Sequence, residues 1–294
     1  MDYNKLPKLP ERSENSNKGT FGKILNVSGS EYMTGAAYLS SVSALKIGAG
    51  YVELASHDNV LKVASAKAPE IVLAPTDKIP EIIKNSTVLL IGCGLSTTNE
   101  AKNLFTNTIK LAKNIPTVID ADGLNILSEN NIELPKNTIL TPHPKEASRL
   151  LNCSLDEILS DMEKSAKKIS EKYNCVTVLK SHKTIVTSQE GEIYYNNTGN
   201  SALAKAGSGD VLAGMIAGLL AQNMQTFEAS VLGVYLHGLS GDLAKNDLTA
   251  YGVLATDTIR YIPYAIKNYL KLSNWYYFLE QFLLELLHFL QNQY

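Results

Sequence analysis

Short runs of β-branched and aliphatic residues alternate with helical patterns along most of this 294-residue chain. The run Thr87–Gly92 (TVLLIG) is almost continuously apolar, which is typical of a central parallel strand covered on both faces. Similar runs lie at 23–28, 51–55, 117–120, 138–141 and 175–180, and helical patterns lie at 35–48, 99–113 and 155–173. This alternation predicts βαβ units, and therefore an α/β fold with helices on both faces of a parallel sheet.

The same patterns indicate the edge of the sheet and the extent of the domain. The runs 184–188 and 192–196 flank a three-residue turn and predict an antiparallel hairpin at the sheet edge. No linker-like stretch interrupts residues 20–270, which we therefore assign to one domain. We interpret residues 1–19 as a flexible lead-in and residues 271–294 as an atypical apolar helical tail.

Composition excludes several classes of protein. The formal net charge is −2 at pH 7, so no basic excess favours a nucleic-acid partner. The three cysteines include no CxxC pair, which argues for a reduced, cytoplasmic setting without disulfides or a zinc site. The N-terminus lacks the apolar segment of a signal peptide, and the apolar tail is short for a membrane span. We therefore expect a cytoplasmic protein with no membrane span.

Polar motifs follow four of the predicted strands. They are Gly92–Ser96 (GCGLS), Asp120–Asn125 (DADGLN), Thr141–Pro144 (TPHP) and Lys180–Thr184 (KSHKT). Ligands of open α/β sheets bind outside the carboxyl ends of the strands. A site built from several strand ends is more specific than any one of these motifs, so we expect them to form one ligand site.

The segment Gly207-Ser208-Gly209-Asp210 introduces a predicted buried helix over 211–221. A glycine turn lets backbone N–H groups approach an anion, and a helix N-terminus adds unpaired donors and a positive dipole. A carboxylate at this place would repel an anion unless it faces a substrate hydroxyl. Asp210 could instead be only a helix cap, but the small residues around it favour a general base for attack on phosphorus.

Three other groups of residues have two possible interpretations. His143 lies between two prolines and could serve a structural turn or donate to a substrate oxygen. Asp120, Asp122 and Asn125 could cap turns, or they could hold Mg²⁺ through water or contact substrate hydroxyls. The segment 180–184 could be a solvated hairpin turn or a phosphate or adenine-nucleotide site.

The motifs taken together resemble the ADP/ATP-dependent NAD(P)H-hydrate dehydratase family. The resemblance is carried by KGTFGKILNVSGS (18–30), TGAAYLSSVSALKIGAGYV (34–52), LLIGCGLS (89–96), VIDADGLNIL (118–127), ILTPHPKEASRLL (139–151), LKSHKT (179–184) and NSALAKAGSGDVLAGMIAGLLAQ (200–222). It implies a ribokinase-like three-layer α/β/α sandwich with a mostly parallel central sheet and no lid domain. It also implies nicotinamide cofactor repair, in which ATP or ADP phosphorylates the hydroxyl of hydrated NADH or NADPH (S epimer) and loss of phosphate restores the double bond.

The resemblance also implies roles for individual residues. Asp210 would be the base and contact the hydrate. The other substrate contacts would be Ala36 or Ala37, Gly94, His143 and Asn125. The adenine-nucleotide site would comprise Lys180, Ser181, His182, Lys183, Thr184, Gly207, Ser208 and Gly209. Mg²⁺ is an expected cofactor whose ligands the sequence does not assign, and the expected partners are further copies in a homotetramer and an epimerase on a separate chain.

Departures from the family pattern affect the details of the pocket. Ser181 stands where glycine is usual, and Cys93 stands where proline is frequent. A small-molecule kinase of the same fold, of the hydroxyethylthiazole-kinase type, is the alternative enzyme. A non-catalytic nucleotide sensor is a third hypothesis, but pure binding would not need Asp210 beside a phosphate.

Overall fold

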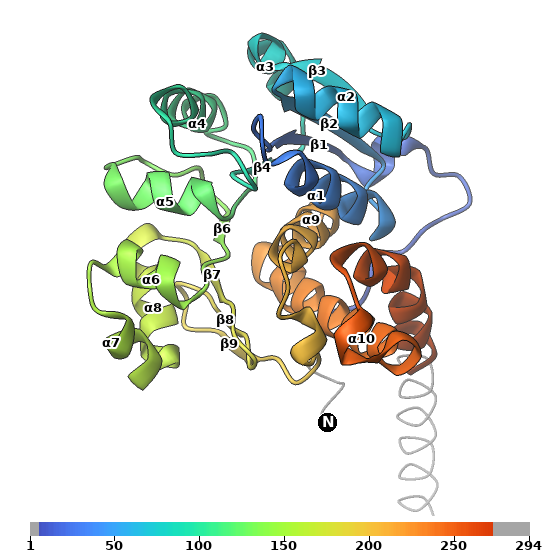
Figure 1. Cartoon of the computed structure of the whole chain (residues 1–294), viewed down its shortest axis with the longest axis vertical. Helices are drawn as coiled ribbons and strands as arrows, with labels where there is room; N and C mark the ends of the chain where they lie inside the picture. The colour runs from blue at the N-terminus through green and yellow to red at the C-terminus, as the bar shows by residue number, and fades with distance from the viewer. Residues whose placement is uncertain (1–5, 273–294) are drawn as a thin grey trace, which may run out of the picture.

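A nine-stranded sheet forms the centre of the computed structural model, which describes residues 6–272 (Figure 1). Its strands are β1 (Lys23–Val27), β2 (Tyr51–Ser56), β3 (Val72–Pro75), β4 (Val88–Ile91), β5 (Thr117–Ile119), β6 (Thr138–Leu140), β7 (Val176–Leu179), β8 (Ile185–Thr187) and β9 (Ile193–Tyr195). The strand order is β3-β2-β1-β4-β5-β6-β7-β8-β9. The first seven strands in this order, from β3 at one edge to β7, pair in parallel. Strands β8 and β9 add the predicted antiparallel hairpin at the other edge.

Helices cover both faces of the sheet. One face carries α1 (Thr34–Lys46), α2 (Asp58–Lys67), α9 (Ser208–Ala221) and α10 (Thr226–Gly252). The other face carries α3 (Ile79–Ile82), α4 (Asn99–Leu111), α5 (Asp122–Glu129), α6 (Pro144–Leu151), α7 (Leu155–Ser160) and α8 (Met162–Tyr173). The 3-10 turns are η2 (Lys18–Phe21), η3 (Thr76–Lys78), η4 (Ile83–Asn85) and η5 (Ser201–Leu203). The predicted three-layer arrangement is thus present.

Strand β4 shows why a continuous apolar run marks the centre of the sheet. Val88 and Leu90 pack in the cluster on the α9 side, whereas Leu89 and Ile91 pack in the cluster on the α4 side. All four side chains are fully buried. A strand covered on both faces has no polar side, so its sequence cannot alternate.

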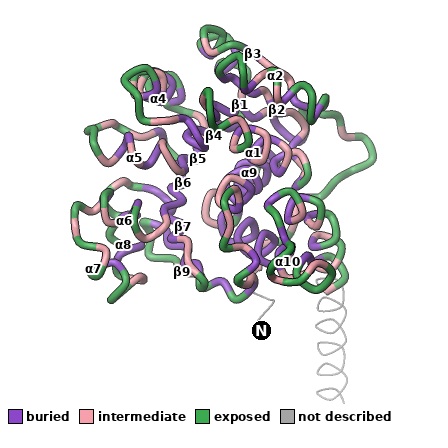
Figure 2. The backbone as a smooth tube through the Cα atoms, viewed as in Figure 1, coloured by how far each residue is buried: buried purple, intermediate pink, exposed green. Residues whose placement is uncertain are grey.

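Helix α9 packs on one face of the sheet next to α1 and is buried almost all round (Figure 2). It packs tightly on α1, because a Cβ at Gly214 would lie 2.1 Å from the carbonyl oxygen of Ser40. Gly218 makes the same kind of approach to Ala44. This close packing holds the N-terminus of α9 in place at the carboxyl edge of the sheet.

Some elements differ from the sequence-based expectation. The helical pattern at 155–173 is two helices, because Asp161 ends α7 and its side chain caps α8 by accepting from the backbone N–H of Lys164. Edge strand β3 and helix α2 were not predicted, since their short, mixed sequences lack a clear period.

Both ends of the chain touch the domain within the described range. The Tyr269 hydroxyl donates to the carbonyl of Pro7, and Arg12 donates to the carbonyl of Gly48. A last helical segment runs from residue 255 to residue 272, and the predicted tail beyond it lies outside the described residues. No helix within residues 6–272 has the length and apolarity needed to cross a membrane.

Candidate functional site

The four polar motifs converge at the carboxyl edge of the sheet. They follow β4, β5, β6 and β7, which are neighbours in the sheet, and the N-terminus of α9 points into the same region. Gly92 packs so closely on the next strand end that a Cβ there would lie 2.2 Å from the carbonyl oxygen of Asp120. The expectation that these motifs share one place is confirmed by this geometry.

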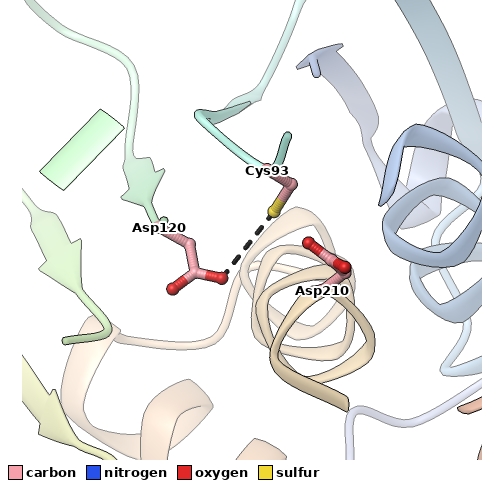
Figure 3. Close-up of side chains that lie close together, drawn as sticks. All are labelled: Cys93, Asp120 and Asp210. Carbon is pink, nitrogen blue, oxygen red and sulfur yellow. Dashed lines mark hydrogen bonds between the residues drawn. The ribbon is translucent and has the colours of Figure 1, made fainter. Parts of the chain in front are cut away.

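Cys93, Asp120 and Asp210 form the centre of this region (Figure 3). The three side chains come from the segment after β4, the end of β5 and the first turn of α9, and their ligand atoms all lie within 4.8 Å of one another. The Cys93 Sγ atom donates to Oδ2 of Asp120 over 3.8 Å. Two carboxylates and a thiol therefore lie close together, and Cys93 and Asp120 are buried.

Lys180, which follows β7, neutralises Asp120. Its Nζ atom lies 2.6 Å from Oδ1 of Asp120, and the Thr141 hydroxyl donates to the same oxygen over 2.7 Å. Burial lowers the pKa of Lys180, but the charges of Asp120 and Glu146 outweigh it, so that the net shift of this pKa is upward. Lys180 is therefore a fixed cation at the centre of the site.

Asp210 is held in conditions that suit a base. Burial, followed by the charge of Asp120, raises the pKa of Asp210 to about 6, although the neighbouring Cys93 thiol and the charge of Lys180 oppose the rise. A carboxylate with a pKa near neutrality is ionised at pH 7 and still has useful affinity for a proton. This electrostatic tuning is typical of functional sites.

The start of α9 differs from the sequence-based expectation. Helix α9 begins at Ser208, so Ser208, Gly209 and Asp210 form its first turn and are not a turn before it. Gly207 alone forms the turn, with a φ of 91°, and a Cβ there would lie 2.6 Å from Leu39. Gly209 faces the ion pair, because a Cβ there would lie 3.4 Å from the Nζ atom of Lys180.

His143 has the structural role that was one of its two interpretations from the sequence. Its Nδ1 atom accepts from the backbone N–H groups of Lys145 and Glu146 and so caps α6, with Pro144 at the first helical position. Because Nδ1 accepts, neutral His143 carries its hydrogen on Nε2, and the side chain is 45% exposed. Burial lowers the pKa of His143, which favours this neutral form.

Glu146 is a site residue that the sequence reasoning missed. It is buried, accepts from the backbone N–H of His143 over 2.8 Å, and lies 3.9 Å from the Nζ atom of Lys180. Burial raises the pKa of Glu146 to about 7. The signal was present in TPHPKE, because a glutamate three residues after an N-cap completes a capping box.

Buried His237, on α10, is a second residue that the sequence reasoning missed, and it has no sequence signal. Its Nε2 atom has no hydrogen-bond partner within residues 6–272, and burial lowers the pKa of His237 to about 4. The charge of Lys180 adds to this lowering, while a backbone hydrogen bond at Ser208 opposes it. His237 thus stays neutral beside the first turn of α9.

The predicted substrate residues are placed unequally. Ala36 lies beside Gly94, whose Cβ would come within 2.8 Å of it, whereas Ala37 is fully buried in the core with α2. Ala37 therefore has no surface open to a ligand. Asn125 accepts from Arg149 over 2.7 Å and contacts Asp122, which in turn accepts from the backbone N–H of Ser96.

The segment after Lys180 forms a tight turn before β8. Thr184 is buried, and its hydroxyl accepts from the backbone N–H and donates to the carbonyl of Ser181. Ser181 accepts from the backbone N–H of Lys183, and both His182 and Lys183 are exposed. Lys180 is thus the member of this segment that joins the central cluster, whereas His182 and Lys183 lie at the surface.

Comparison with known proteins decides the family. The family model for NAD(P)H-hydrate dehydratase matches residues 24–264. The chain belongs to the NAD(P)H-hydrate dehydratase family. An ADP-dependent (S)-NAD(P)H-hydrate dehydratase of Neisseria meningitidis is 41% identical over 251 residues, which cover 83% of this chain and 84% of that protein. The predicted family and its reaction class, a lyase that dehydrates hydrated nicotinamide cofactors, are thereby confirmed.

Solved structures support the fold. The ADP/ATP-dependent NAD(P)H-hydrate dehydratase of Bacillus subtilis, co-crystallised with ATP and Mg²⁺, superposes with a TM-score of 0.80 at 30% identity, over 89% of this chain and 94% of that one. A hydroxyethylthiazole kinase of Pyrococcus horikoshii has a TM-score of 0.61 at 13% identity, over 83% of this chain and 89% of its own, which shows the fold alone. The ribokinase-like expectation is confirmed, and the kinase alternative has only this distant likeness.

Another relative is longer. A bifunctional NAD(P)H-hydrate repair enzyme of Coxiella burnetii is 35% identical over 255 residues, which cover 86% of this chain and 52% of that protein. The chain thus spans about half the length of this bifunctional relative.

Proposed function

We propose that this chain converts the S form of hydrated NADH or NADPH back to the reduced cofactor, with ADP or ATP as co-substrate, and that Asp210 is the catalytic base. Asp210 accepts the proton of the ring hydroxyl as that oxygen bonds to the terminal phosphorus and the nucleotide's P–O bond breaks. The C–O bond of the phosphorylated ring then breaks, and phosphate leaves with the bonding electron pair. Loss of a proton from the neighbouring ring carbon restores the double bond.

The observation that carries this proposal is the position of Asp210 in the first turn of α9. The N–H groups of a first helical turn have no partner inside the helix, and the dipole there favours an anion. In this proposal the base and the phosphate site thus share the first turn of the same helix. Because Gly209 has no side chain, the phosphate can approach the backbone next to Lys180.

The remaining predicted residues have places that suit their proposed roles. We assign His143 to the substrate, because its side chain is 45% exposed just after β6, although its Nε2 atom also lies 3.5 Å from Oε1 of Glu146. We also assign Gly94 and Ala36, which lie side by side next to Met33, to the substrate, together with Asn125 in α5. We assign Ser181, His182, Lys183 and Thr184 to the adenine nucleotide, together with Lys180, Gly207 and Ser208 around the phosphates.

Mg²⁺ is proposed as the cation that accompanies the nucleotide phosphates. The cluster Cys93–Asp120–Asp210 does not suit it as a protein cage, because Mg²⁺ prefers oxygen ligands. Moreover, Lys180 already neutralises Asp120. We therefore assign Mg²⁺ to the phosphates and name no protein ligand.

We also propose a homotetramer in the cytoplasm that works with an epimerase on a separate chain. The support for the epimerase is the bifunctional repair relative, of which this chain spans about half. Light scattering on protein eluting from a size-exclusion column measures the molar mass and so tests the tetramer directly.

The deciding experiment mixes the purified protein with NADPH hydrate, Mg²⁺ and either ADP or ATP. We expect the near-ultraviolet absorbance of the reduced nicotinamide to recover only when a nucleotide is present. Asp210→Asn should lose at least about a hundredfold in rate, the lower range of general-base effects, while it still binds nucleotide in calorimetry.

Asp77→Asn is the matched control. Asp77 is exposed in η3 after edge strand β3, so its amide variant should keep the wild-type rate. Folded protein that restores no absorbance with either nucleotide would refute the proposal. A wild-type rate in Asp210→Asn would remove Asp210 from the mechanism.

A further inference from the structure

The segment that leads into α9 packs directly on α10. A Cβ at Gly199 would lie 3.4 Å from the Cα atom of Gly238. One turn further along α10, a Cβ at Gly241 would lie 2.7 Å from the side chain of Leu203. The backbone of residues 199–203 therefore follows one face of α10 closely.

Asp242 lies on this same face of α10 and binds the start of the segment. Its Oδ2 atom accepts from the backbone N–H of Gly199 over 2.9 Å, and its Oδ1 atom accepts from Nδ2 of Asn200 over 2.7 Å. Among residues 6–272, no basic side chain forms an ion pair with Asp242. Both oxygens of the carboxylate are thus used to hold this segment, and charge-assisted hydrogen bonds of this kind are stronger than neutral ones.

Short-range hydrogen bonds connect Asn200 to the first residue of α9. Asn200 accepts from the backbone N–H of Ala202 through Oδ1 and from that of Leu203 through its carbonyl. The backbone N–H of Lys205 donates to the carbonyl of Leu203, and the carbonyl of Lys205 accepts from the backbone N–H of Ser208 over 3.3 Å. Because α9 begins at Ser208, the segment that Asp242 holds is linked to the helix N-terminus without a break.

We propose that Asp242 is a positioning residue for the nucleotide, which holds residues 199–208 in the conformation that binds it before the nucleotide arrives. This inference rests on the nucleotide role proposed for Gly207, Ser208 and Gly209. Asp242 touches no reacting atom in this scheme and acts only through the segment that it holds. A segment that is already ordered loses little entropy on binding, so the affinity for the nucleotide is higher.

An exchange of two side chains separates these hydrogen bonds from simple packing. In Asp242→Asn one amide oxygen faces two donors, the N–H of Gly199 and Nδ2 of Asn200, so one donor loses its partner. Turning the amide of Asn200 round only moves the mismatch, because its Oδ1 atom already accepts from Ala202. Adding Asn200→Asp restores every bond, since the new carboxylate accepts both from Ala202 and from the amide introduced at position 242.

Asp247→Asn is the matched control. Asp247 also lies on α10 and accepts from a side chain, the hydroxyl of Tyr261. It is exposed, and this partner lies outside the segment 199–208. The control variant should therefore bind nucleotide like the wild type.

The first measurement is the dissociation constant for ADP and for ATP, obtained by calorimetry without the hydrate. In Asp242→Asn it should rise about tenfold, the scale of one lost hydrogen bond to a charged group, while the KM for the hydrate changes much less. The double variant Asp242→Asn/Asn200→Asp should return to the wild-type affinity. A wild-type affinity in folded Asp242→Asn would overturn the inference, and so would equal losses for nucleotide and hydrate, because a general loosening of the fold weakens both.

The second measurement is amide hydrogen exchange and needs no substitution. If the segment is ordered beforehand, the amide hydrogens of Gly199 and Ala202 should exchange slowly in the nucleotide-free wild type. In Asp242→Asn that of Gly199 should exchange faster. Fast exchange of both amides in the nucleotide-free wild type would overturn the inference even if Asp242→Asn failed to fold.

The two proposals fail in different ways. If neither nucleotide binds to the wild type, or if Gly209→Ala binds both as tightly as the wild type, the nucleotide site fails and the inference falls with it. If Gly209→Ala binds weakly while Asp242→Asn keeps the wild-type affinity, only the role of Asp242 is refuted.

Discussion

The Nζ atom of Lys180 lies 2.6 Å from Oδ1 of Asp120, which joins the ends of β7 and β5 across the intervening end of β6. Both side chains are largely buried, at 18% and 2% exposure. This ion pair, together with the hydrogen bond from Thr141, connects the ends of three strands. It also determines the charges that lie next to Asp210. It thus links the stability of the fold to the chemistry of the site.

Removing the cation should destabilise the protein strongly. Lys180→Met leaves Asp120 as a buried, unpaired charge, for which the expected loss is about 3–5 kcal/mol of unfolding free energy. Chemical denaturation followed by circular dichroism measures it. Lys183→Met is the matched control, since exposed Lys183 should change stability by less than about 0.5 kcal/mol. Equal losses in the two variants would contradict this view of the ion pair.

Glu146 should make stability fall as the pH rises. Burial raises its pKa from 4.5 to about 7 in the folded protein, so the protonated form favours folding. This contribution is present below about pH 4.5 and is lost as the pH rises through about 7. Glu146→Gln resembles the protonated form, so it should flatten the pH dependence of stability. Above about pH 7 its free energy of unfolding should exceed that of the wild type by up to about 3 kcal/mol.

Denaturation midpoints across this pH range test the prediction. Glu157→Gln is the control, because Glu157 holds the same capping-box position in α7. Hydrogen bonds from Ser154 lower the pKa of Glu157, so its contribution has the opposite sign and is lost as the pH falls. A pH dependence unchanged in Glu146→Gln would show that the carboxyl is ionised in the folded protein.

His143 should show separable structural and functional roles. His143→Ala removes the N-cap of α6 and should cost about 1 kcal/mol, whereas asparagine caps well and His143→Asn should keep most of that stability. Both variants lose the Nε2–H, so both should raise KM or lower kcat for the hydrate. Parallel measurements of stability and kinetics distinguish the roles, and full activity in His143→Asn would limit His143 to capping.

Glycine-to-alanine changes should have three different outcomes. Gly209→Ala meets only ordinary contacts, the shortest 3.4 Å, so the fold should persist while the methyl group obstructs the phosphate and activity falls. Gly35→Ala, with nothing within 4 Å, should leave activity unchanged. The Cβ atom added by Gly214→Ala would lie 2.1 Å from the carbonyl oxygen of Ser40. This substitution should lower the free energy of unfolding by at least about 1–3 kcal/mol.

Melting temperature and turnover of the three variants provide the test. A Gly209→Ala enzyme with wild-type turnover would place the phosphate elsewhere than the first turn of α9. A Gly214→Ala protein as stable as the wild type would mean that α9 and α1 can move apart.

The sequence by itself determined the layered α/β fold, the edge hairpin and the motifs that form the site. These features depend on local patterns: apolar runs for covered strands such as β4, glycines where backbone approaches backbone, and polar residues at strand ends. The motifs and their order along the chain were also sufficient to identify the family. Short elements with mixed composition, such as β3, carried no comparable signal.

The tertiary structure alone decided which of these residues act on one another. Lys180 and Asp120 are 60 positions apart, and only the neighbouring positions of β5, β6 and β7 bring their charges into contact. The burial of Glu146 and the thiol contact of Cys93 depend on packing from distant segments, which no local pattern encodes. A pKa follows from burial and neighbouring charges, so the ionisation of Asp210 belongs to the folded molecule and not to its sequence motif.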